Sequence, residues 1–311
     1  MQTILGANGI IATELAKELH KSYTKDIRLV SRNPRKVNES DVLFKADLLD
    51  ANQTADAVKS SEIVYMTAGL PYNAKIWQEQ WPVVMKNVID ACKKHQAKLV
   101  FFDNVYMYGQ VIGTMTEETP FNAVSVKGKA RAGIATMVLN ELKNKTLNAM
   151  ICRAPEFYGP RNTLSGTNAT IFDNIKNKKS LQVILSDSTL RTLIYTPDAG
   201  RATALLGNTP DAYNQTWHLP CDNNRLTTKQ FIEMTSEIYG EKLKYSTMGK
   251  LLVRIVGLFV PFVKEIIELL YQWEQDYIFD SSKFMKRFPD FKVTSLREGI
   301  TEIIGEIKAG Q

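Results

Sequence analysis

Thr-Ile-Leu-Gly-Ala-Asn-Gly-Ile-Ile-Ala, residues 3–12, is the stretch of sequence that decides the fold. A short apolar run leads into a glycine turn, and a helical pattern begins at Ala12 and keeps one apolar face through Leu19. A glycine turn between a strand and a helix is the context in which glycine motifs bind a dinucleotide. We expect Gly6 to supply the tight turn, Gly9 to let the backbone approach a pyrophosphate, and Ala12 to allow close helix–strand packing.

Amide groups at the start of a helix favour phosphate oxygens, because their N–H groups have no partner within the helix. We therefore predict that Gly6, Asn8, Gly9 and Ile10 contact the phosphates of a dinucleotide. A glycine-rich turn that binds nothing is the alternative interpretation.

Short apolar runs recur after this turn, and helical patterns such as 81–95 fill most of the gaps between them. The runs are 27–31, 42–46, 62–67, 98–103 and 149–153. Strands that alternate with helices indicate a parallel sheet covered on both faces. We predict an α/β fold with a Rossmann-type doubly wound parallel sheet of six strands.

The regular alternation of strands and helices ends near residue 160. From there the loops are longer, and the helical patterns 170–176 and 229–239 lie among short strands. This change predicts a smaller α+β C-terminal substrate-binding region. We expect residues 1–160, completed by parts of 198–222, to form an NADP-binding Rossmann domain, and residues 161–311 to form most of the substrate-binding region.

Composition excludes several classes of partner. The 311 residues carry a formal net charge of +6, but the basic residues are scattered rather than gathered in a stripe, so we expect no nucleic-acid partner. Cys92, Cys152 and Cys221 stand far apart and the three histidines have no ligand spacing, so we expect neither a disulfide framework nor a metal site. This cysteine usage favours a reduced, cytoplasmic protein.

The most lipid-like stretch is 251–263. It is too short to span a bilayer and contains Arg254 and Pro261, so we predict a buried or lid-forming helix rather than membrane association, and we expect no membrane partner. The first strand occupies the extreme N-terminus with no basic region before it, which also favours a cytoplasmic location over secretion.

The end of the second strand indicates which dinucleotide is bound. NAD-binding folds usually place a carboxylate there, but Asp26 precedes the strand, whose carboxyl end reads Ser31-Arg32. A guanidinium can grip a phosphate with two hydrogen bonds, and Ser31 adds a hydroxyl. These residues favour NADP over NAD, and a solvated basic loop is the alternative.

The glycine spacing Gly6-x-x-Gly9-x-x-Ala12 is followed by other segments in a fixed order. These are Asp47-Leu48, Ala68-Gly69, Leu-Val-Phe-Phe-Asp-Asn-Val-Tyr-Met-Tyr-Gly (99–109), Arg-Ala-Pro-Glu-Phe-Tyr-Gly-Pro (153–160) and Arg-Thr-Leu-Ile-Tyr-Thr-Pro-Asp (191–198). Together they resemble the short-chain dehydrogenase/reductase superfamily, in its extended, nucleotide-sugar-epimerase-like branch. The resemblance implies that Asp47 and Leu48 contact the adenine and that Ala68 and Gly69 lie beside the cofactor ribose.

The catalytic residues of that family do not carry over intact. The family uses a Ser or Thr after the fifth strand and a Tyr-x-x-x-Lys on the next helix, where the lysine lowers the pKa of the tyrosine and holds the nicotinamide ribose. By this alignment Lys129 is the lysine, Ser125 replaces the tyrosine, and Asn104 stands at the serine position. Lys127, on the same predicted helix, is interpreted as a solvated charge.

An aliphatic hydroxyl is a far weaker acid than a tyrosine, so Ser125 is expected to position substrate or water. Asn104 can donate an amide hydrogen bond to a substrate oxygen. Tyr106 is the first candidate for a substitute proton donor, and packing is its alternative role. Tyr72, Tyr158 and Arg191 are predicted to bind substrate.

The resemblance therefore implies an atypical member of the superfamily, and two functions remain open. The first is an NADP(H)-dependent epimerase, dehydratase or reductase acting on a small molecule such as a nucleotide sugar or carbonyl compound. The second is a non-catalytic NADP-binding redox sensor or regulator. Relatives of this branch are often dimeric, so we expect a monomer or a homodimer.

Overall fold

The computed structural model describes residues 1–161 and 163–310. The chain forms two compact units, and each is made of discontinuous segments. The first comprises Met1–Met107, Val126–Ala154 and Ala199–Leu219. The second comprises Tyr108–Ser125, Pro155–Asp198 and the described chain from Pro220 onward. The assignment of residues 1–160 to cofactor binding and of residues 161–311 mostly to substrate binding stays a prediction.

The first unit is built on one parallel sheet with the order β12-β7-β5-β4-β1-β2-β3. Its strands are β1 (Gln2–Leu5), β2 (Ile27–Ser31), β3 (Val42–Lys45), β4 (Ile63–Met66), β5 (Lys98–Asp103), β7 (Ala149–Arg153) and β12 (Thr216–His218). Its helices are α1 (Ile10–Ser22), α2 (Ala51–Val58), α3 (Ala74–His95), α4 (Val126–Asn144) and most of α6 (Thr196–Gly207), with the short turns η1 (Tyr106–Tyr108), partly in this unit, and η3 (Pro210–Ala212). This is the Rossmann-type doubly wound sheet that the alternating pattern predicts.

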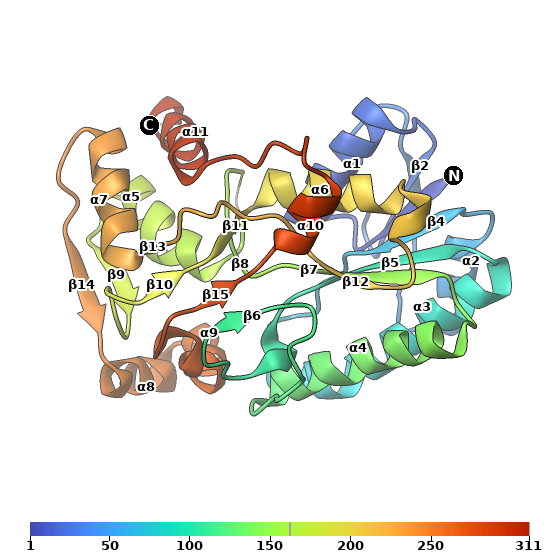
Figure 1. The fold of residues 1–311 in the computed structure, drawn as a ribbon, viewed down its shortest axis with the longest axis horizontal. Coiled ribbons are helices and arrows are strands. Elements are labelled where there is room, and N and C mark those ends of the chain that lie inside the picture. Colours follow the sequence, from blue (N-terminus) through green and yellow to red (C-terminus); the bar gives the residue numbers. More distant parts are fainter. Residues whose placement is uncertain (162, 311) are drawn as a thin grey trace. The chain divides into compact units, whose positions relative to one another are not determined.

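Helices cover both faces of this sheet. Figure 1 shows α1 and α6 on one face and α3 and α4 on the other. The predicted apolar face of α1 is confirmed, since Ala12 and Leu19 are fully buried. Gly200 of α6 lies so close to α1 that a Cβ atom there would be 2.7 Å from the Cβ of Glu14.

The six predicted strands are present within one or two residues of their expected limits. The sheet nevertheless has a seventh strand, β12, which the sequence reading missed. Its three residues, Thr-Trp-His, are too few to show either an apolar run or an alternation. Pairing with β7 in parallel places Trp217 opposite Cys152 and extends the sheet at that edge.

The second unit combines short strand pairs with helices, as the change of rhythm near residue 160 predicts. Its strands are β6 (Thr114–Met115), β8 (Glu156–Tyr158), β9 (Leu181–Ile184), β10 (Leu190–Arg191), β11 (Leu193–Tyr195), β13 (Leu226–Thr227), β14 (Tyr245–Met248) and β15 (Ile278–Phe279). Its helical segments are η2 (Asn168–Phe172), α5 (Asp173–Lys176), α7 (Thr228–Tyr239), α8 (Lys250–Phe259), α9 (Pro261–Ile266), η4 (Ile267–Trp273), α10 (Ser282–Arg287) and α11 (Leu296–Ala309). Capping boxes at Thr227 and Ser295 fix where α7 and α11 begin.

Two local expectations are wrong. The helix expected to contain Ser125 begins one residue later, at Val126. For 251–263 the expectation of a buried helix is wrong, because Leu258 and Phe259 of α8 are 79% and 80% exposed, whereas the lid-forming alternative stays a prediction. High hydrophobicity predicts burial only on average, and this helix departs from that average.

Gly6 is the position where the fold tolerates no side chain. Its φ is +95°, and a Cβ atom there would lie 2.3 Å from the Cα of Ala68, so both the backbone and the neighbouring strand end require glycine. We expect Gly6→Ala to lower the free energy of unfolding by about 3 kcal/mol or more. Denaturant unfolding followed by circular dichroism measures this.

Gly133→Ala is the matched control for this prediction. Gly133 is an exposed position inside α4 with open space where a Cβ would be, so alanine there should raise the free energy of unfolding by about 0.5–1 kcal/mol. Equal stability of the Gly6→Ala variant and the native protein would contradict the close approach.

Candidate functional site

The glycine turn joins β1, β2 and β4 at one edge of the sheet. The amides of Gly6 and Ala7 both donate to the carbonyl oxygen of Val30, at 2.9 and 3.1 Å, and the amide of Gly9 donates to the carbonyl oxygen of Gly6 at 3.2 Å. The bare Cα of Gly6 brings Ala68 against the turn. The glycine turn and the segment at Ala68, which are both predicted to contact the cofactor, are thereby held together by the backbone alone.

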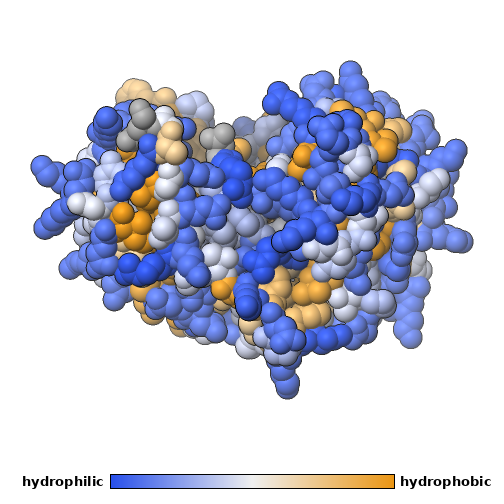
Figure 2. Space-filling model, turned by 90° about the horizontal axis from the view of Figure 1, so that it is seen from above, coloured by the Kyte–Doolittle hydropathy of each residue, from blue (hydrophilic) through white to orange (hydrophobic). Residues whose placement is uncertain are grey.

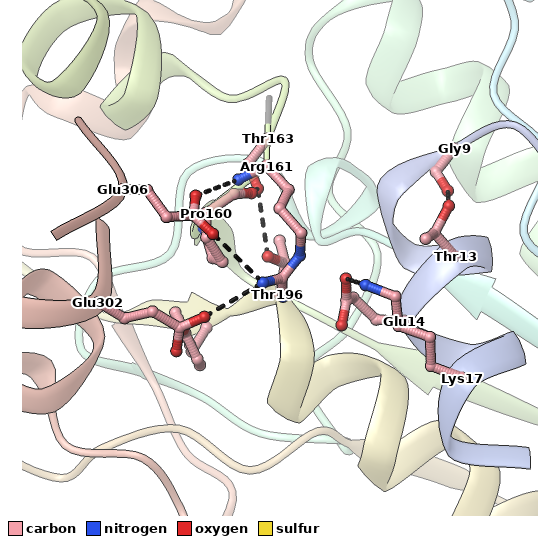
Figure 3. Close-up of polar contacts among 11 residues, drawn as sticks. Gly9, Thr13, Glu14, Lys17, Pro160, Arg161, Thr163, Thr196, Glu302 and Glu306 are labelled. Atoms are coloured by element: carbon pink, nitrogen blue, oxygen red, sulfur yellow. Dashed lines mark hydrogen bonds and ion pairs between the residues drawn. The ribbon is translucent and has the colours of Figure 1, made fainter. Parts of the chain in front are cut away.

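Helix α1 starts directly at the turn, with Gly9 as its N-terminal cap. No side chain caps this end, and Gly9 and Asn8 are both exposed. Figure 3 shows Thr13, whose hydroxyl donates to the carbonyl oxygen of Gly9 at 3.1 Å, and Glu14, which pairs with Lys17 at 3.1 Å. The first amides of α1 therefore face an open, uncapped position, which suits a phosphate.

The carboxyl end of β2 lies beside the same turn, because the Asn8 side-chain amide donates to the carbonyl oxygen of Asn33 at 2.9 Å. The hydroxyl oxygen of Ser31 is buried and has no hydrogen-bond partner within the described residues. Arg32 is exposed, one residue beyond the end of the strand. A buried hydroxyl and an exposed guanidinium are thus presented next to the glycine turn.

The ends of β3 and β4 supply the remaining predicted cofactor residues. The Asp47 carboxylate accepts from the amide of Leu49 at 3.0 Å, and the Leu48 carbonyl oxygen accepts from the side chain of Asn87 at 2.9 Å. Gly69 is exposed, with nothing within 4 Å of the position of a Cβ atom. Since the four strands are parallel neighbours, their carboxyl ends form one edge, where open α/β sheets bind ligands.

A buried carboxylate closes the carboxyl end of β5. Asp103 is 1% exposed, and its Oδ1 accepts from Arg131 Nε of α4 at 2.8 Å and from the amide of Asn104 at 2.9 Å. Arg153 of β7 approaches its Oδ2 at 3.7 Å. The guanidinium of Arg131 also stacks 4.7 Å from the ring of Trp81. These contacts join the sheet to α4 at the candidate catalytic position.

Asn104 is held in place by the same loop. Its side-chain oxygen accepts from the amide of Tyr106 at 3.0 Å. A substrate oxygen would therefore meet the amide nitrogen of Asn104, which is the donor that the sequence reading expects of this residue.

Three aromatic side chains form a cluster near Asn104, and a lysine contacts one of them. The hydroxyl groups of Tyr106 and Tyr72 lie 3.3 Å apart, and the Tyr106 ring stacks on Trp77 with centroids 6.2 Å apart. The ammonium of Lys127 lies 4.7 Å from the centroid of the Tyr72 ring. Lys127 is fully buried, so its interpretation as a solvated charge is wrong.

The two lysines of α4 therefore differ in environment. Lys127 is buried in this cluster, whereas Lys129, which the Tyr-x-x-x-Lys alignment selects, is exposed. Ser125 is buried and belongs to the second unit, immediately before the helix. The sequence does carry a signal for Lys127, because it shares the helical spacing of Arg131 and Ile134, which are both buried.

The second unit holds a depression of about 530 Å³, including space open to solvent, next to Arg191. Arg191 is 7% exposed, donates to the carbonyl oxygen of Gln272, and stacks 4.5 Å from the Tyr277 ring. Its Nη2 is buried and has no hydrogen-bond partner within residues 1–161 and 163–310. Burial lowers the pKa of Arg191, and the carboxylate of Glu156 opposes this shift. Arg191 thus lines the depression and has one buried donor without a partner among the described residues.

Tyr158 lies in the hydrophobic core of the second unit. It is 1% exposed and packs against Tyr195 and Phe231, with centroid distances of 5.3 and 6.1 Å. A Cβ atom at Gly299 would lie 2.6 Å from its hydroxyl oxygen, and burial raises its pKa well above the usual value. These surroundings are those of a packing residue.

Arg161 of the second unit forms ion pairs with two carboxylates. Figure 3 shows its side chain between Glu302 and Glu306, and Nη1 lies 3.2 and 3.4 Å from their oxygens. Glu302 also accepts from the hydroxyl of Tyr195 at 2.5 Å, which helps burial to raise the pKa of that tyrosine. The network ties the loop after β8 to α11.

In the part of the chain that the structure describes, no group of three or more His, Cys, Asp or Glu side chains is placed to hold a metal ion. Among the same residues, no helix combines the length and the apolar character needed to cross a bilayer.

Comparison with known proteins gives the family. The family model described as "NAD dependent epimerase/dehydratase family" matches residues 3–218. A UDP-D-apiose/UDP-D-xylose synthase of Oryza sativa subsp. japonica is 21% identical in an alignment 288 residues long, which covers 76% of this chain and 72% of the relative.

Solved structures show the same fold at low identity. The UDP-glucuronic acid 4-epimerase of Bacillus cereus in complex with NAD has a TM-score of 0.81 and 17% identity, with 99% of each chain covered. A dTDP-glucose 4,6-dehydratase of Streptomyces venezuelae with NAD and TYD bound has a TM-score of 0.79 and 14% identity, with 99% of this chain and 97% of that chain covered.

Gly9 tests whether a dinucleotide rests on the glycine turn. A Cβ atom there would meet its nearest neighbour at 3.6 Å, so the protein accommodates it, but the atom would occupy the space in front of the first turn of α1. We expect Gly9→Ala to cost no more than about 1 kcal/mol of stability and to weaken NADPH and NADH binding at least about tenfold. Calorimetric titration and thermal unfolding measure the two effects. Unchanged binding would contradict the prediction that the pyrophosphate lies against this turn.

Proposed function

Since this chain belongs to the NAD dependent epimerase/dehydratase family, we propose that it is an NADP(H)-dependent enzyme that acts on a nucleotide sugar or a related carbonyl compound. The observation that carries the proposal is the contact of buried Lys127 with Tyr72, whose hydroxyl meets that of Tyr106. A buried cation beside two phenol groups is an arrangement that moves a proton, since positive charge favours the phenolate form.

The names of the relatives support the substrate class. They act on UDP- or dTDP-linked sugars, which carry a diphosphate. Arg191 offers a buried donor without a partner among the described residues, and a guanidinium binds phosphate oxygens well. We assign Arg191 to the anionic part of the substrate on this basis. The aromatic surroundings of Tyr158 leave it a supporting role in packing.

The cofactor proposal rests on this chain's own residues. The neighbouring structures carry NAD, and the coarser statement, an NAD-type dinucleotide, follows from the family. We propose NADP because Ser31 and Arg32 stand at the end of β2, where a 2′-phosphate would lie, and the first residue after the strand is a cation rather than a carboxylate. Gly6, Asn8, Gly9 and Ile10 would hold the pyrophosphate. Asp47, Leu48, Ala68 and Gly69 would line the adenosine and ribose parts.

When bound, the nicotinamide supplies hydride transfer. In the proposed mechanism Tyr106 exchanges a proton with the substrate oxygen, and the Tyr72 hydroxyl donates to the Tyr106 oxygen when that oxygen is negative. Lys127 stabilises the charge through the ring that it touches. Asn104 donates its amide to the substrate oxygen, and the bond from the Tyr106 amide holds it in orientation.

A regulatory protein that binds NADP without turnover is the second candidate. The residues that align with the family's catalytic pair do not form one, because Ser125 is buried and Lys129 is exposed. This candidate predicts tight NADPH binding together with no conversion of any sugar nucleotide.

Arg32→Ala tests the choice of cofactor. Loss of a charged hydrogen bond to the 2′-phosphate should weaken NADPH binding by about 1.5–3 kcal/mol and leave NADH binding unchanged. Fluorescence titration with both cofactors measures the difference. Arg35→Ala, an exposed arginine in the same loop, is the matched control and should change neither affinity. Equal losses for NADPH and NADH would rule out the assignment.

Tyr106→Phe and Lys127→Met test the catalytic proposal. Tyr106→Phe removes the hydroxyl that exchanges the proton and Lys127→Met removes the charge that stabilises it, while each keeps a side chain of similar volume, so we expect kcat to fall by about 100-fold or more with little change in NADPH affinity. The assay follows conversion of UDP-glucuronic acid, UDP-glucose and dTDP-glucose by proton NMR. Lys129→Met is the control and should keep its activity.

The outcome also separates the two candidates. A larger loss of kcat in Lys129→Met than in Lys127→Met would mean that Lys129, the lysine that aligns with the family motif, is the catalytic one. Tight NADPH binding without conversion of any of the three sugars would favour the regulatory protein.

A further inference from the structure

Helix α8 of the second unit (Figure 1) presents a continuous apolar face to solvent. Leu251, Leu258 and Phe259 are 72%, 79% and 80% exposed. Leu252 and Ile255 complete the face and are about half exposed. At 100° per residue these five side chains fall within one third of the helix circumference, so they form one stripe rather than scattered contacts.

The opposite side of α8 is anchored in its own unit. Val253 is 2% exposed, and a Cβ atom at Gly257 would lie 2.8 Å from a methyl carbon of Ile267 in η4. The helix is therefore fixed by one face while the other remains uncovered. The uncovered surface continues past the helix end, where Val260 and Phe262 are 41% and 50% exposed.

The charges within this segment of the chain have one sign, and the first carboxylate after it is Glu265. Between Gly249 and Lys264 the chain has no Asp or Glu and three basic residues, Lys250, Arg254 and Lys264. Lys250 pairs with Glu274 at 2.6 Å. Arg254 and Lys264 are exposed, and Arg254 stands at the border of the stripe.

Other exposed surfaces differ from α8. The face of the molecule drawn in Figure 2 carries mostly hydrophilic side chains. Highly exposed apolar residues elsewhere do not form such a stripe: Leu164, at 92%, stands between Thr163 and Ser165, and Ile112, at 94%, has only the partly buried Val111 as an apolar neighbour in sequence, which is normal for a protein surface. A stripe of five large apolar side chains bordered by cations indicates a surface that is covered when the protein works.

We propose that α8 binds the surface of an anionic lipid bilayer, with its apolar stripe among the acyl chains and Arg254 and Lys264 on the headgroups. Ten helical residues span about 15 Å, half of the ~30 Å hydrocarbon core, so the helix lies in the plane of the interface rather than across it. This arrangement is that of interfacial amphipathic helices. The proposal is independent of the proposed function and goes against the expectation of no membrane contact.

The charge pattern distinguishes this occupant from a second copy of the chain. Self-association through the stripe would bring Arg254 and Lys264 of both copies to the same interface, where like charges oppose binding. An anionic bilayer meets the apolar stripe and its basic border with complementary surfaces.

Vesicle sedimentation of the full chain tests the proposal. We expect the protein to sediment with phosphatidylcholine vesicles that contain phosphatidylserine, and less with phosphatidylcholine alone or at high salt. The double variant Leu258→Asp/Phe259→Asp should bind at least ~10-fold more weakly, because two carboxylates enter the apolar interface. Arg254→Glu should reduce binding only to the vesicles with phosphatidylserine.

Ile112→Asp is the matched control, since it places a carboxylate on an equally exposed apolar residue outside α8, and it should bind vesicles like the native protein. Circular dichroism and NADPH titration confirm that each variant is folded. Absence of native protein from the vesicle pellet, or equal sedimentation of the double variant, would overturn the proposal. A native dimer that the double variant converts to a monomer, without vesicle binding, would assign the stripe to a second copy.

Discussion

The buried carboxylate of Asp103 is the constraint on which the candidate catalytic site depends. A charge with 1% exposure has to be paired, because desolvating an unpaired carboxylate costs several kcal/mol. Arg131 of α4 satisfies Oδ1 at 2.8 Å, and Arg153 of β7 approaches Oδ2 at 3.7 Å. The same Oδ1 accepts from the amide of Asn104 and so fixes the loop after β5. One carboxylate thereby sets the positions of a helix, two strands and the loop that carries Asn104.

This pairing fixes the rotation of α4 about its axis, and the rotation decides which lysine is buried. Lys127 is four residues before Arg131 and therefore lies on the same face, one turn nearer the start of the helix. Lys129 is two residues before Arg131, which turns it about 200° away, onto the exposed side. The alignment with the family's Tyr-x-x-x-Lys spacing selects Lys129, but the ion pair at Asp103 brings Lys127 to the aromatic cluster.

The sequence predicts most elements that have a periodic apolar pattern, and the turn in which only glycine fits. The glycine turn and six of the strands follow from a glycine spacing and from apolar runs that parallel strands require. Elements that are very short, or whose apolar face is exposed, cannot be predicted in this way. Strand β12 has only three residues, and the outward face of α8 has the composition of a buried helix. Lys127 was missed because a motif alignment took precedence over the buried spacing that it shares with Arg131 and Ile134.

The source of the hydroxyl groups separates this site from the family arrangement it resembles. In that arrangement the tyrosine and the lysine lie four residues apart on one helix, so local geometry alone brings them together. Here the lysine comes from α4, Tyr72 from the loop before α3, and Tyr106 from the turn after β5, so only the tertiary fold joins them. The ammonium of this lysine lies 4.7 Å from the centroid of the Tyr72 ring. Complete burial of Lys127 places this charge in a medium of low dielectric, where a cation interacts more strongly with a nearby ring and its hydroxyl group than it would in water.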